Sequence, residues 1–143
     1  MDILNVLEKA TQINSVSGSE NEIRKFISDN VKKYCDELSV DAMGNLIAHK
    51  KGSGKKIMFA AHMDEIGIIV TDIDDKGFVR FSSVGGLNLR NLVNLRVRFA
   101  NGVEGVIYFE QMSEGGSFDV DMKRMFIDIG AATRAEALSK VQI

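Results

Sequence analysis

The chain has 143 residues, of which 45% are hydrophobic and 27% charged, and its formal net charge is −2. These values match a soluble globular protein and exclude a disordered or fibrous chain. The near-neutral charge gives no electrostatic case for a nucleic-acid partner, and no apolar stretch approaches the ~18 residues of a membrane span. A single cysteine and the lack of a signal-peptide pattern predict a cytoplasmic location.

The first part of the chain predicts two helices. Apolar residues spaced along residues 3–11 predict a short amphipathic helix. Ser19 and Glu22 form a capping-box pattern, and the apolar stripe behind them predicts a second helix over about residues 20–35.

A hairpin and a buried strand are predicted next. Alternating segments flank the turn residues Gly44-Asn45, so residues 38–48 are expected to form a β-hairpin. The run Ile-Met-Phe-Ala-Ala at residues 57–61 is entirely apolar or small, which is typical of a strand buried on both faces of a sheet.

The apolar run stops at His62, and Asp64 follows two positions later. Side chains two residues apart in extended chain point the same way, and residues just past such a strand line the ligand crevice of open α/β sheets. An imidazole ligates divalent metals, and a nearby carboxylate fixes its tautomer or ligates in turn. His-x-Asp alone is a weak motif, and the alternative is a solvated loop with an acidic cluster.

The second part of the chain predicts a β-rich unit that begins near residues 66–68. Short strands are expected at residues 67–73, 78–83, 94–100, 103–108 and 125–129. Their close spacing and the turn signals between them are typical of a small barrel or sandwich. Residues 113–121 predict a loop, and a second capping box, Thr133 with Glu136, predicts a last helix to about residue 141.

Four segments in this order resemble the glutamyl aminopeptidase and cellulase-M type of cytosolic metallopeptidases. They are Val16-Ser17-Gly18-Ser19-Glu20, Asp41-Ala42-Met43-Gly44-Asn45-Leu46-Ile47, Ala61-His62-Met63-Asp64-Glu65-Ile66-Gly67 and Phe126-Ile127-Asp128-Ile129-Gly130-Ala131. The resemblance implies an α/β fold class. Residues 1–67 would start a zinc-peptidase-like catalytic domain, residues 68–143 would form a β-rich, PDZ-like or barrel insertion domain for subunit contact, and both would be incomplete.

The same resemblance implies the site residues. His62 would ligate one of two divalent metal ions, zinc or cobalt, and Asp64 would serve catalysis by hydrogen-bonding that histidine. Glu65 would have a local structural role, and His49 on the hairpin would have none.

By resemblance, the protein would be a metal-dependent aminopeptidase that removes N-terminal residues from short peptides and assembles as a tetrahedral homo-oligomer of twelve subunits. Family members are more than twice this length, and their other metal ligands and general base lie beyond residue 143. The chain is therefore expected to be a fragment that is inactive alone. The alternative is a non-catalytic module whose PDZ-like domain binds a peptide or a partner subunit. Neither reading involves nucleic acid or a membrane.

Overall fold

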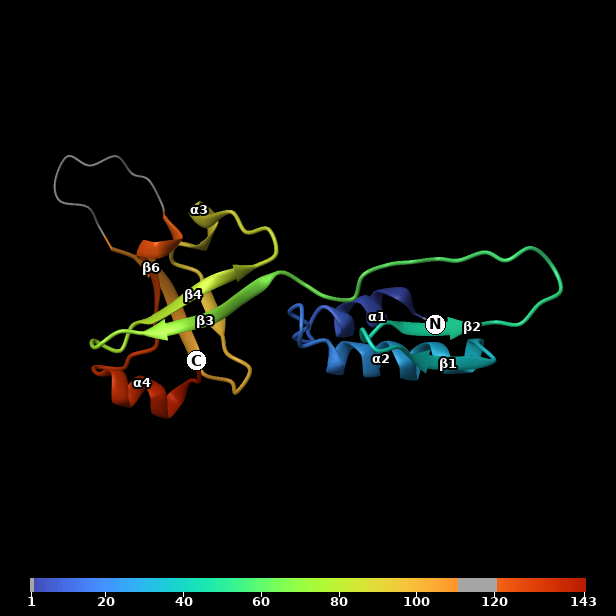
Figure 1. The fold of residues 1–143 in the computed structure, drawn as a ribbon, viewed down its shortest axis with the longest axis horizontal. Helices are drawn as coiled ribbons and strands as arrows, with labels where there is room; N and C mark the ends of the chain where they lie inside the picture. Colours follow the sequence, from blue (N-terminus) through green and yellow to red (C-terminus); the bar gives the residue numbers. More distant parts are fainter. Residues whose placement is uncertain (1, 111–120) are drawn as a thin grey trace. The chain divides into compact units, whose positions relative to one another are not determined.

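The computed structural model describes residues 2–110 and 121–143, which form two compact units, Met1–Glu65 and Ile66–Ile143 (Figure 1). Almost all of the predicted loop at 113–121 falls outside the described residues. The role of the second unit as a PDZ-like insertion for subunit contact stays a prediction.

The first unit contains helices and one hairpin. Its elements are α1 (Ile3–Ala10), α2 (Asn21–Val31), the 3₁₀ helix η1 (Lys32–Tyr34), β1 (Glu37–Val40) and β2 (Leu46–His49). The predicted first helix is confirmed, and the Asp2 carboxylate caps it by accepting from Leu4 N at 3.1 Å. The predicted hairpin is also confirmed, because β1 and β2 pair antiparallel around a turn at Asp41 and Asn45.

The predicted capping box of the second helix is wrong. The N-cap of α2 is Glu20, and no side chain caps this helix end. The Glu20 carboxylate instead accepts from Gly18 N at 2.7 Å, while Ser19 N donates to Val16 O at 2.8 Å. Ser19 is thus part of the preceding turn and lies one position too early to cap the helix.

The predicted strand at residues 57–61 is wrong as well. The segment has no strand structure, and its side chains are exposed, 94% in the case of Phe59. A strand buried on both faces needs paired neighbours and an apolar layer on each side. Among the described residues of the first unit, β1 and β2 form the sole sheet, and they pair with each other.

The second unit is built on a five-stranded antiparallel sheet. Its strands are β3 (Gly67–Ile73), β4 (Val79–Val84), β5 (Arg96–Arg98), β6 (Glu104–Phe109) and β7 (Met125–Asp128), in the order β3-β4-β7-β6-β5. All five predicted strands are present, with ends that differ by a few residues from the expected ones. The edge strands β3 and β5 do not pair with each other, so the sheet stays open. The short helices α3 (Leu89–Leu92) and η2 (Met122–Arg124) were not predicted.

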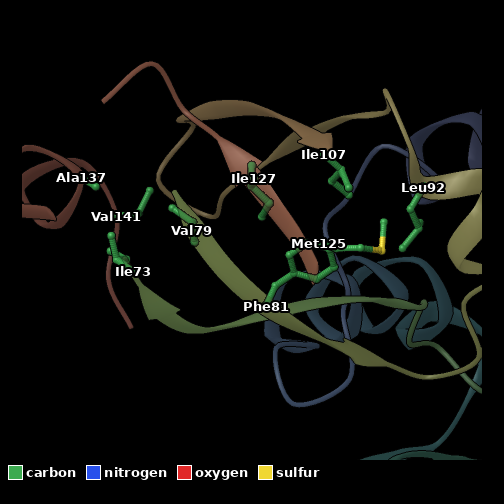
Figure 2. Packing of buried hydrophobic residues seen from close by; sticks show 9 residues of the cluster. All are labelled: Ile73, Val79, Phe81, Leu92, Ile107, Met125, Ile127, Ala137 and Val141. Carbon is green, nitrogen blue, oxygen red and sulfur yellow. The ribbon is translucent and has the colours of Figure 1, made fainter. Parts of the chain in front are cut away.

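The core of the second unit lies along this sheet (Figure 2). Nine buried residues form it, namely Ile73, Val79, Phe81, Leu92, Ile107, Met125, Ile127, Ala137 and Val141. The last two come from helix α4 (Arg134–Lys140) and the residue that follows it. The Thr133 hydroxyl caps α4 by accepting from Glu136 N at 3.2 Å, so the second capping box correctly predicted this helix start. No helix in the described parts of the chain has both the length and the apolar character to cross a bilayer.

Candidate metal centre

The structure brings His62 and Asp64 into direct contact in the first unit. His62 Nδ1 lies 3.1 Å from Asp64 Oδ1 and 3.0 Å from the Asp64 carbonyl oxygen. Both partners are acceptors, so the neutral imidazole carries its proton on Nδ1 and donates it to Asp64. This assignment leaves the lone pair on Nε2, and the His62 side chain is 86% exposed.

The second oxygen of Asp64 is also engaged. The Ser17 hydroxyl donates to Asp64 Oδ2, while Oδ1 faces His62. This hydroxyl holds the pKa of the Asp64 carboxyl below its usual range, and the bond to His62 acts in the same direction. Asp64 therefore stays a carboxylate near neutral pH and keeps its charge next to the imidazole.

Glu65 fixes the backbone of this segment. Glu65 N donates to Ser15 O at 2.9 Å, and Ser15 N donates to Glu65 Oε1, also at 2.9 Å. Next to these bonds, Val16 and Glu65 form an isolated parallel β-bridge. Ser15 is buried, so the bonds also satisfy backbone groups that are away from water.

The arrangement suits one ligand of a metal site. Metal-bound histidines usually donate their other ring N–H to a carboxylate or carbonyl, which is the pattern at His62 Nδ1. Nε2 is then the ligating nitrogen. The described residues contain no group of three or more His, Cys, Asp or Glu side chains placed to hold a metal ion. His49 lies on β2 with Nδ1 3.2 Å from Glu37 Oε2, and it belongs to the exposed hairpin surface.

The second unit has a cavity of about 350 Å³, and its described lining does not offer the histidine-based metal ligation for which the geometry at His62 is suited. Its lining residues are Asp74, Asp75, Lys76, Phe78, Arg80, Glu110 and Phe126. Arg80 pairs there with the carboxylates of Asp74, at 2.9 Å, and Glu110. Arg80 is thus already engaged by two carboxylates, and none of the described residues that line the cavity is a histidine or a cysteine.

Comparison with known proteins identifies the family. The sequence profile of the M42 glutamyl aminopeptidases matches residues 44–143. The chain belongs to the M42 glutamyl aminopeptidase family. The profile match includes the His62–Glu65 segment, so the contact between His62 and Asp64 lies within the part of the chain that the family shares.

M42 relatives match nearly the whole chain. A protein of Acetivibrio thermocellus with a provisional aminopeptidase name is 53% identical over 142 residues, which are 99% of this chain and 43% of the relative. The lysyl aminopeptidase of Pyrococcus furiosus is 38% identical over 143 residues, with 92% of this chain and 41% of the relative covered. The chain thus spans about two fifths of these relatives' length.

Solved M42 structures share the fold. A TET aminopeptidase from a marine sediment thaumarchaeote superposes with a TM-score of 0.89 at 30% identity, covering 98% of this chain and 42% of the other. The TET1 peptidase of Pyrococcus horikoshii gives a TM-score of 0.80 at 38% identity, over 97% of this chain and 44% of the other. That peptidase assembles into a tetrahedron or a large octahedral shell. The predicted α/β fold class and the predicted family are confirmed.

Sequence reasoning named His62 and Asp64 and missed the role of Ser17. Ser17 belongs to the first of the four family-like segments, yet its hydroxyl meets a carboxylate 47 positions away. No local pattern reports a contact over that distance. The one clue in the sequence was that the family-like segment with Ser17 and the one with Asp64 occur in the same chain and in the family's order.

Proposed function

We propose that this chain is part of a metal-dependent aminopeptidase that hydrolyses N-terminal residues of short peptides. The observation that carries the proposal is the His62–Asp64 contact, in which Nδ1 is held by Asp64 and Nε2 is left for a metal ion. The membership of the chain in the M42 family supports the same activity.

His62 would act as one metal ligand, and Asp64 would orient it and raise its basicity. A complete site would hold two divalent ions, zinc or cobalt. Ions of this kind lower the pKa of a bound water and polarise the carbonyl of a peptide bond. The chain's own contribution is to present Nε2 in a fixed direction, with Asp64 ionised behind the imidazole.

The remaining ligands and the general base would come from outside this chain. The described residues hold no cluster of three metal-ligating side chains, and the chain covers 43% of the Acetivibrio relative. We expect the 143-residue chain to be inactive alone. A tetrahedral twelve-subunit homo-oligomer is our proposal for the assembled enzyme, supported by the tetrahedral assembly of the Pyrococcus horikoshii TET1 peptidase.

A test of metal dependence uses a protein of the relatives' full length that carries this chain. Activity is followed on aminoacyl-p-nitroanilides with a free amino group and on the same compounds with that group acetylated. We expect turnover of the free-amine substrates only, loss of turnover after dialysis against a chelator, and recovery with zinc or cobalt. Turnover that survives complete removal of metal would contradict the proposal.

The alternative is a non-catalytic module in which the β-rich unit binds a peptide strand at its sheet edge. The open edge strand β3, seven residues long, favours it, because unpaired backbone groups accept an added strand. The bulge between Val70 and Asp72 and the ion pair from Arg134 to Asp72 oppose it, because bulges and charges block edge pairing. Peptide capture that is indifferent to chelator, without turnover, would support this alternative.

A further inference from the structure

Residues 15–17 run alongside Asp64 and Glu65 and are tied to them by three side-chain and backbone contacts. Two of these join Ser15 and Glu65 through their backbone and the Glu65 carboxylate, each at 2.9 Å. The third runs from the Ser17 hydroxyl to Asp64 Oδ2. Ser17 therefore binds the carboxylate that orients His62, and among the described residues its hydroxyl makes no hydrogen bond to His62 itself.

Asp64 is held by both of its oxygens. Ser17 donates to Oδ2, and His62 Nδ1 lies 3.1 Å from Oδ1. Rotation of the carboxylate about its Cβ–Cγ bond would break one of these contacts or both. The serine therefore restricts the carboxylate to the orientation in which Oδ1 accepts from the imidazole.

The turn that carries Ser17 is itself held in place. Gly18 has φ +92°, a left-handed conformation that glycine adopts without a side-chain clash. Gly18 N donates to Glu20 Oε1 at 2.7 Å, and Ser19 N donates to Val16 O at 2.8 Å. Helix α2 begins directly afterwards, so the hydroxyl of Ser17 sits on a short, internally bonded turn.

We propose that Ser17 is a positioning residue, which holds the Asp64 carboxylate in the orientation that fixes His62 as the Nδ1–H tautomer with Nε2 directed to a metal ion. This inference rests on the proposed metal-site function of His62. Ser17 would touch neither the metal nor the substrate, and its effect would be transmitted through Asp64.

The first test needs no metal. In the metal-free form of the full-length protein that carries this chain, ¹⁵N-edited NMR of the histidine ring nitrogens reports the tautomer of His62, and a neutral imidazole without a fixed partner populates both tautomers. We expect the wild type to show mainly Nδ1–H, and Ser17→Ala to shift part of the population toward Nε2–H, because the Asp64 carbonyl oxygen, 3.0 Å from Nδ1, remains as an acceptor. Ser17→Thr keeps the hydroxyl and should restore the wild-type spectrum. Ser19→Ala is the matched control, because within the described residues the Ser19 side chain makes no hydrogen bond and is exposed.

The second test measures zinc affinity by competition with a chelator, in the full-length protein that carries this chain. Loss of partners behind a metal ligand typically weakens metal binding by ~10- to 100-fold, and Ser17 acts one step further from the metal, so we expect about a 10-fold loss in Ser17→Ala. Ser17→Thr and Ser19→Ala should bind zinc as the wild type does.

The two tests separate this inference from the proposed function. A His62→Ala variant that loses zinc, combined with a Ser17→Ala variant unchanged in both tautomer and zinc affinity, would overturn the role of Ser17 alone. Failure of His62→Ala to weaken zinc binding would overturn the metal-site assignment itself. A Ser17→Thr variant as defective as Ser17→Ala would also overturn the inference, because the hydroxyl would then not be the group that matters.

Discussion

Alternation along the extended segment explains why Asp64 orients His62 while Glu65 does not. The short Asp64 side chain reaches the imidazole two residues earlier, at 3.1 Å from Nδ1. Glu65 is on the other side of the extended segment, and its longer side chain turns back to Ser15 N at 2.9 Å. Two adjacent carboxylates thus have different tasks, one facing the metal ligand and the other anchoring the backbone.

The charge of Asp64 can be tested with Asp64→Asn. The amide has nearly the same shape, but it is neutral and can present either its oxygen or its NH₂ group to His62 Nδ1. We expect zinc affinity to fall by about 10- to 100-fold, the usual cost of losing a partner behind a ligating histidine. Competition with a chelator in the full-length protein measures this zinc affinity.

Asp29→Asn is the control for this substitution, because Asp29 pairs with Lys25 on an exposed helix surface. It should leave zinc affinity unchanged. Equal zinc affinity for Asp64→Asn and the wild type would show that the carboxylate charge has no part in the site.

At the scale of residues, the sequence predicted those contacts that are local. His62 and Asp64 could be paired because strand geometry repeats every two residues. The Ser17–Asp64 contact could not be predicted, since it joins residues 47 positions apart. The Ser19–Glu22 pattern misled for a different reason: the local bond from Ser19 N to Val16 O places Ser19 in a turn, so the helix begins one residue later.

At the scale of elements, strands were predicted correctly where their partners lie within the chain. Short turns join β3 to β4 and β5 to β6, and each of the five strands finds a hydrogen-bonded neighbour in the same sheet. The run 57–61 has equally strong apolar character but no such neighbour among the described residues. Apolar composition shows that a segment tends to be buried. It does not show whether the chain also contains the neighbouring strands that would bury it.

Close packing between β6 and β7 predicts a large effect of Gly105→Ala. Gly105 is buried, and an added Cβ would lie 2.5 Å from Ile127 Cγ2 and 2.9 Å from Ile129 Cγ2. Overpacking of this kind costs about 1–3 kcal/mol in the free energy of unfolding. Urea unfolding followed by far-ultraviolet circular dichroism measures the loss.

Gly52→Ala is the matched control, because an added Cβ at Gly52 meets no atom within 4 Å. Its unfolding free energy should stay close to that of the wild type. If Gly105→Ala were as stable as this control, the tight β6–β7 packing would be contradicted.

At the scale of the whole molecule, the two units differ sharply in burial. The second unit has a nine-residue core, whereas the described buried residues of the first unit are Ile23 and Ser15. Large apolar side chains of the first unit are exposed instead, including Leu4 at 76% and Phe59 at 94%. Apolar surface of this extent is typical of an interaction site. It is consistent with our proposal that residues outside this chain complete the metal centre.

The most direct test compares His62→Ala with His49→Ala, since these are the two histidines of the chain. Zinc-dependent turnover of an aminoacyl-p-nitroanilide is measured in the full-length protein that carries this chain. We predict that His62→Ala abolishes metal-dependent turnover and weakens zinc binding, while the His49→Ala variant stays active, because His49 lies on the exposed hairpin surface. Wild-type turnover in His62→Ala would contradict the assignment of this segment as part of the metal centre.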